Sequence, residues 1–74
     1  MTLADLQPGQ EAEVVSLGLP ADEARMMRAM GLAPGSRVSV GHRAAFGGPL
    51  EVVVGDAVLA VGRDLARAVA VRVQ

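Results

Sequence analysis

The chain has 74 residues, 51% of them hydrophobic, and its eight acidic and seven basic side chains leave a net charge of −1. It is therefore long enough for one domain, residues 1–74, too hydrophobic for a disordered chain and too neutral for a nucleic-acid binder. Cysteine is absent, which excludes a disulfide scaffold and a thiolate metal site.

The first predicted element is a helical turn over residues 2–6. Thr2 is placed to cap this turn, and Leu3 and Leu6 are spaced to point together into a core. A strand follows over residues 10–17, after a Pro-Gly turn. Its inward face stays open, because glutamates and aliphatic residues share one side of the strand.

A helix is predicted next, beginning at Pro20 and running to about Met30. Met26, Met27 and Met30 are spaced by three and four residues and can share one helical face. We interpret them as core residues, with one of the three facing outward. The alternatives are a soft-metal site and a deformable partner groove.

The helix is predicted to end at a glycine cap. Gly31 stands where a left-handed residue is needed, and Leu32 is the apolar residue that folds back onto the last turn. Pro34 and Gly35 then fit the two central positions of a type II turn. We therefore assign Gly31, Pro34 and Gly35 a structural role.

Four further strands are predicted, at residues 36–42, 50–54, 57–61 and 68–73. In the first, Val38, Val40 and His42 are expected on one face. The connector 62–67 is expected to form one helical turn with Leu65 inward. Five short strands favour a mainly β fold, a small closed or nearly closed barrel. It carries one α-helix between the first two strands and short helical turns near both termini.

His42 is the only imidazole of the chain and the only metal-ligand candidate of its type. A ferrous site needs several nitrogen or oxygen ligands, and the chain has neither a second histidine nor a cysteine. We therefore interpret His42 as a strand-end residue, partly packed and bonded to backbone, and keep it only as a weak metal candidate.

Phe46 is the single aromatic residue and lies in a glycine-rich loop. Two interpretations stay open, an interface anchor or a plug folded over the barrel mouth. Arg25 and Arg28 are expected on a solvated helix face, with docking to a partner as the alternative, and Arg43 and Arg63 are judged in the same way.

Enzyme activity is not expected, because the serines have no base beside them in the sequence and the acids are scattered. No catalytic residue and no cofactor is therefore assigned. The chain has no signal-peptide pattern and no apolar run of roughly 18 residues, so we expect a cytoplasmic protein without direct membrane insertion.

The chain resembles the FeoA family, small cytoplasmic accessory proteins of bacterial ferrous iron transport. The resemblance covers essentially the whole sequence and rests on Leu3, Leu6 and Pro8-Gly9 at the start, Arg-Met-Met-Arg-Ala-Met-Gly-Leu-Ala-Pro-Gly at 25–35, Arg-Ala-Ala-Phe-Gly-Gly-Pro-Leu-Glu-Val at 43–52, Ala57–Val61, Ala66 and a terminal Val-x-Val. It implies an SH3-like five-stranded barrel, a family-level association with transition metal ions, and the membrane transporter FeoB as partner.

The resulting hypothesis is a non-enzymatic adaptor that docks onto the cytoplasmic, GTPase-bearing part of FeoB and modulates it. The expected contact surface combines the helix end and the long loop, through Arg25, Arg28, Arg43 and Phe46. Two alternatives remain, an SH3-like regulatory module in iron-dependent repression and a homo-oligomeric interaction domain with weak self-association.

Overall fold

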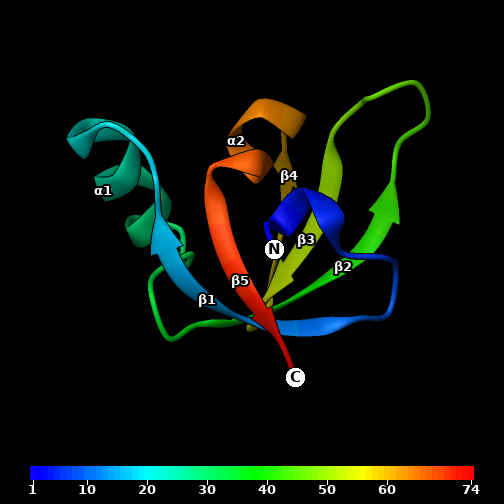
Figure 1. The fold of residues 1–74 in the computed structure, drawn as a ribbon, viewed down its shortest axis with the longest axis horizontal. Coiled ribbons are helices and arrows are strands. Elements are labelled where there is room, and N and C mark those ends of the chain that lie inside the picture. Colours follow the sequence, from blue (N-terminus) through cyan, green and yellow to red (C-terminus); the bar gives the residue numbers. More distant parts are fainter.

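The computed structural model describes all 74 residues. Each predicted element is present, with bounds that differ by at most one residue at either end. In chain order the elements are η1 (Leu3–Asp5), β1 (Glu11–Leu17), α1 (Ala21–Ala29), β2 (Arg37–Arg43), β3 (Leu50–Val54), β4 (Ala57–Val61), α2 (Arg63–Arg67) and β5 (Val69–Val73) (Figure 1).

The five strands form one antiparallel sheet in the order β4-β3-β2-β1-β5. The two outer strands, β4 and β5, do not pair with each other, so hydrogen bonds do not close the sheet into the expected barrel. Their separation has a physical cause. The helix α2 lies between them, and its fully buried residue Ala66 belongs to the same core as Leu3 of η1 (Figure 1).

A single apolar core fills the inner side of the curved sheet, and it contains no buried polar side chain. Leu3 and Leu6 are fully buried, as the sequence predicts. In β1 the buried residues are Ala12 and Val14, which settles the inward face that the sequence left open. Neither helix has the length and apolarity needed to cross a membrane.

The end of α1 has the hydrogen bonds of a Schellman cap. Gly31 has a φ of 100°, and its N–H donates to the carbonyl of Arg28 at 3.0 Å. The N–H of Leu32 donates to the carbonyl of Met27 at 2.9 Å, and both of these side chains are buried in the core. Gly35 has a φ of 91°, as the third position of a type II turn requires.

The face of β2 changes at a β-bulge. The pairing of β2 with β3 is regular up to Val40 and resumes at His42, so Gly41 is an extra residue in the ladder. Val40 is buried, whereas Gly41 and His42 are both exposed. The expectation that His42 shares a face with Val38 and is partly packed is therefore wrong.

Candidate interaction surfaces

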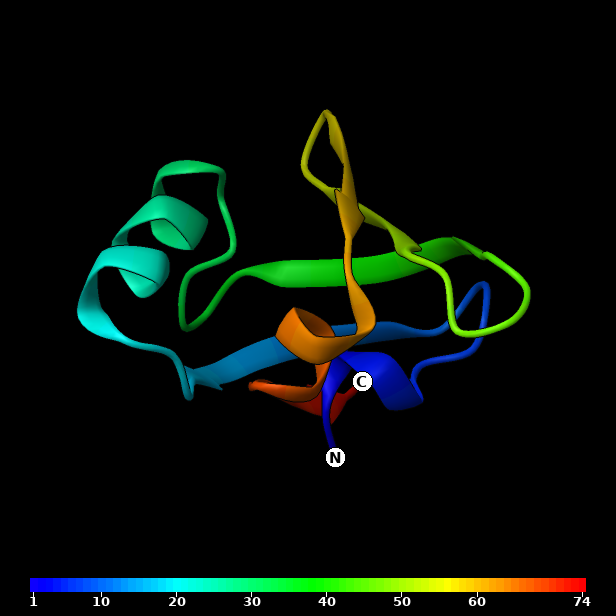
Figure 2. The ribbon, with the colours of Figure 1, turned by 90° about the horizontal axis from the view of Figure 1, so that it is seen from above.

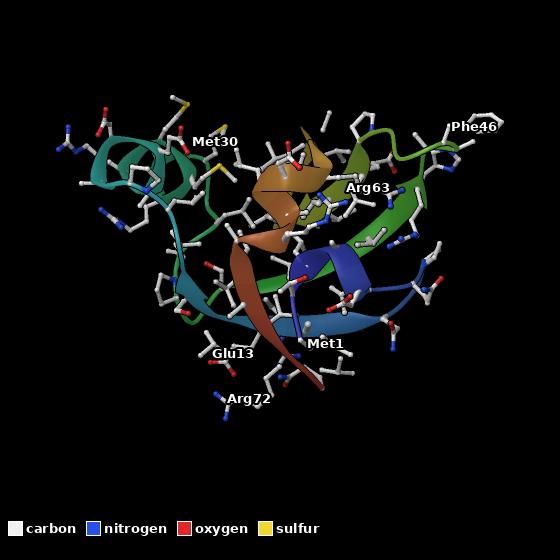
Figure 3. All side chains as sticks on the ribbon, turned by 45° about the horizontal axis from the view of Figure 1, so that its top comes forward. Met1, Glu13, Met30, Phe46, Arg63 and Arg72 are labelled. Carbon is white, nitrogen blue, oxygen red and sulfur yellow. The ribbon has the colours of Figure 1, made fainter.

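The loop between β2 and β3 presents Phe46 to solvent. Its side chain is 106% exposed, and its backbone has a φ of 58°, which is uncommon for a residue with a side chain. Figure 3 shows the ring pointing away from the body of the molecule. The interpretation of Phe46 as a plug folded over the barrel mouth is therefore wrong.

This loop is fixed at its base by Arg63, the first residue of α2. The Arg63 guanidinium donates through Nε to the carbonyl of Gly48 at 2.8 Å and through Nη2 to the carbonyl of Ala44 at 3.1 Å. The Ala44 N–H also donates to the carbonyl of Pro49 at 3.1 Å, which closes the loop. These hydrogen bonds hold the loop that presents the exposed side chain of Phe46.

Arg43 has a role inside the fold. Its Nη1 donates to two carbonyls of the N-terminal segment, those of Ala4 at 2.8 Å and Leu6 at 2.7 Å. The side chain is half-buried and connects the end of β2 to η1. Its guanidinium is therefore occupied within the chain, whereas the sequence assigned it to the contact surface.

Arg25 and Arg28 lie exposed on α1 and make no hydrogen bond or ion pair through their side chains. The helix that carries them and the loop with Phe46 lie at opposite ends of the molecule, as the labelled Met30 and Phe46 show (Figure 3). The structure therefore does not bring the predicted contact residues into one surface.

A groove of about 370 Å³ lies between α1 and β4. Its walls are Met26 and Met27 of α1, Met30 directly after this helix, most of β4, and Leu65 of α2. Met27 is buried, but Met26 is 60% exposed and Met30 is 40% exposed. The expectation that only one methionine faces outward is therefore wrong, because both Met26 and Met30 are exposed at the border of this groove.

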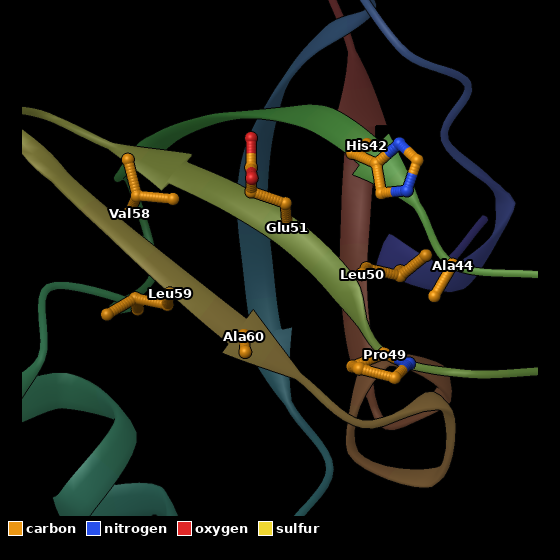
Figure 4. A pocket seen from close by; sticks show the side chains of 8 residues that line it. All are labelled: His42, Ala44, Pro49, Leu50, Glu51, Val58, Leu59 and Ala60. Carbon is orange, nitrogen blue, oxygen red and sulfur yellow. The ribbon is translucent and has the colours of Figure 1, made fainter.

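A smaller pocket of about 280 Å³ lies on the outer face of the sheet (Figure 4). His42 and Glu51, which are paired across β2 and β3, are its two ionisable residues. Nowhere in the chain do three or more His, Cys, Asp or Glu side chains gather in a way that suits a metal ion. His42 and Glu51 alone do not make the ligand set that a ferrous site needs.

The FeoA domain family matches this chain over residues 1–73. The chain belongs to the FeoA family. Its fold agrees with solved FeoA structures. That of Chlorobium tepidum superposes with a TM-score of 0.92 at 30% identity, covering 99% of this chain and 70% of that one. That of Stenotrophomonas maltophilia, a prokaryotic SH3 domain protein in complex with zinc, superposes with a TM-score of 0.82 at 33% identity. The match covers 97% of this chain and 89% of that one.

A third FeoA structure, described as an iron uptake regulatory protein, gives a TM-score of 0.84 at 30% identity and covers 100% of this chain and 99% of that one. A manganese-dependent transcriptional repressor gives 0.85, but at 23% identity and over 41% of its own chain, so that likeness shows the fold alone. No curated protein sequence matches. FeoA proteins are an accessory or regulatory family in iron uptake, and their SH3-like fold is the fold of this chain.

The sequence predicted only part of the groove beside β4, as the alternative in which the three methionines form a partner groove. The groove beside β4 combines residues from α1, β4 and α2, which are far apart in sequence. A signal was nevertheless present, because Ala57–Val61 contains no charged residue and no proline. Outer strands of a sheet commonly carry such residues to prevent unwanted pairing, so a wholly apolar outer strand is informative.

Proposed function

We propose that this FeoA-family chain is a non-enzymatic accessory protein of bacterial ferrous iron transport. In this proposal it is cytoplasmic, docks onto the cytoplasmic, GTPase-bearing part of a FeoB-type transporter, and modulates that transporter. The observation that carries the docking is Phe46, which is fully exposed on a loop held by Arg63.

An exposed aromatic side chain on a fixed loop is suited to be an interface anchor. Burying an aromatic ring against a partner removes a large apolar area from water, and aromatic residues are enriched among those that dominate binding. Because Arg63 braces the loop, little conformational freedom is lost when the ring docks. Arg25 and Arg28 are unpaired cations at the far end, where they favour an acidic partner surface.

The first experiment is an amide NMR titration of labelled protein with the cytoplasmic domain of the FeoB transporter from the same organism. We expect saturable shifts centred on residues 44–49. The Phe46→Ala variant is expected to bind at least about tenfold more weakly, as for other aromatic anchors. Val15→Ala, a change at an exposed residue of β1, serves as the control. Equal affinity of the two variants would contradict the proposed anchor.

Modulation is tested by the rate of GTP hydrolysis of the same domain. We expect the wild-type chain to change that rate and Phe46→Ala to change it less at equal concentration. A rate that is unaffected by saturating wild-type protein would refute modulation while leaving docking intact. The alternative role in iron-dependent repression is supported by the fold alone, so we do not advance it.

A further inference from the structure

The two outer strands of the sheet have different edges. The free edge of β5 is covered by the N-terminus, where Thr2 pairs with Ala70 and the Val71 N–H donates to the Met1 carbonyl at 2.9 Å. The free edge of β4 has no such cover. Its backbone pairs with β3 on one side and makes no other hydrogen bond.

The groups left unpaired on β4 follow from the hairpin that it forms with β3. Two residues, Gly55 and Asp56, connect the strands, so the flanking residues Val54 and Ala57 form a hydrogen-bonded pair. Bonded and non-bonded pairs then alternate along the ladder. The N–H and C=O groups of Val58 and Ala60 therefore point outward, and this hairpin projects from the rest of the sheet (Figure 2).

A pocket lies on each side of this edge. Val58, Leu59 and Ala60 line both the groove with the methionines and the outer pocket with His42 and Glu51 (Figure 4). In a β-strand, successive side chains point to opposite faces. A strand added at β4 would therefore place alternate side chains in the two pockets.

The charges in the two pockets indicate which side chains fit. The groove beside α1 contains no charged residue, so it suits aliphatic side chains. In the outer pocket the carboxylate of Glu51 is exposed and has neither an ion-pair partner nor a hydrogen bond. A lysine or arginine of the added strand would supply the missing cation.

We infer that β4 accepts an extended segment of a partner protein as a sixth strand, with aliphatic side chains in the methionine groove and basic side chains beside Glu51. Backbone hydrogen bonds to Val58 and Ala60 hold such a segment, and the two pockets select its sequence. A second copy of this chain fits less well. Antiparallel pairing of two β4 strands brings only Val58 and Ala60 to the outer pocket and leaves Glu51 without a cation.

The test uses a nine-residue synthetic peptide of alternating leucine and lysine, titrated into the labelled full-length chain and followed by amide NMR. We expect saturable shifts in β4, in the methionines of α1, and at His42 and Glu51. A peptide of the same sequence, N-methylated at every residue, keeps the side chains but cannot donate backbone hydrogen bonds. It is expected to cause no saturable shift. Equal binding of both peptides would overturn the inference.

Val58→Lys is the decisive variant, because Val58 is 61% exposed and lysine is well tolerated on outer strands. It is expected to weaken peptide binding at least about tenfold by placing a charge on the edge. Val15→Lys, at an exposed position of β1, is the matched control and is expected to bind as the wild type does. Equal affinity of the two variants would overturn the inference.

The basic side chains of the peptide are tested separately with Glu51→Gln. This variant is expected to bind the peptide several-fold more weakly and to lose most of the salt dependence of binding. Sedimentation of the peptide-free chain tests whether a second copy of this chain binds at β4 instead. A concentration-dependent dimer that Val58→Lys abolishes would show that a second copy fills the edge, and would overturn the inference. No transporter is present, so failure here is distinct from failure of the proposed function.

Discussion

Gly31 ends α1 and lets Leu32 turn into the core, because its φ of 100° is open to glycine at no steric cost. A Cβ at this position would also meet Cγ1 of Val54 at 3.1 Å. Gly31→Ala is therefore expected to lower the free energy of unfolding by about 1–3 kcal/mol in urea titrations. Gly62→Ala is the control, since its φ is −62° and its Cβ position is open. Equal midpoints for both variants would contradict the assigned cap.

The orientation of His42 was predicted wrongly from the sequence. Alternation with a period of two places it on the same face as Val38 and Val40, and this holds only while the ladder is regular. The extra residue Gly41 reverses the alternation and turns the imidazole to solvent. A glycine inside a strand pattern was the available signal, because such glycines often mark bulges.

The helix α1 was predicted correctly as an element, but its exposure was not. The spacing of Met26, Met27 and Met30 shows that they share a face; it does not show how much of that face is covered. In the structure α1 lies at one end of the sheet, and only Ala24 and Met27 are buried. The rest of the methionine face borders the groove whose opposite wall is formed by β4.

The short element η1 predicts a specific dependence on pH. The Thr2 N–H donates to Oδ2 of Asp5 at 2.9 Å, and this bond holds the pKa of the Asp5 carboxyl below its ordinary value of 3.8. Because the folded pKa is the lower one, the stabilisation is present above the unfolded pKa and is lost as pH falls through the folded pKa.

Asp5→Asn is therefore expected to destabilise the chain near neutral pH and to matter less in acid, where the wild-type carboxyl is itself protonated. The measurement is the urea midpoint of both proteins as a function of pH. If the two curves stay parallel down to the acid limit, the carboxylate bond to Thr2 does not contribute to folding.

At the scale of the whole molecule, turn and cap residues predicted the order and bounds of the elements. They did not predict that the sheet stays open between β4 and β5. Whether β4 and β5 pair depends on the space that α2 occupies between them. The sequence of this five-residue helix does not show where the helix packs. The same limit applies to the contact surface. The helix α1, which carries Arg28, and the loop with Phe46 lie at opposite ends of the molecule because of the topology, which no local pattern encodes (Figures 1 and 3).

The strands β4 and β5 share no hydrogen bonds, and α2, which lies between them, is held in part by side chains. Arg63 joins α2 to the loop at 44–49 through two carbonyls, and it is half-buried. Arg63→Lys keeps the charge but loses the planar fork, so we expect a loss of about 1–2 kcal/mol of unfolding free energy and faster amide exchange at Gly48. Arg67→Lys, in an exposed ion pair with Asp64, is expected to cost at most about 0.5 kcal/mol. Equal losses in the two variants would mean that Arg63 does not brace the loop.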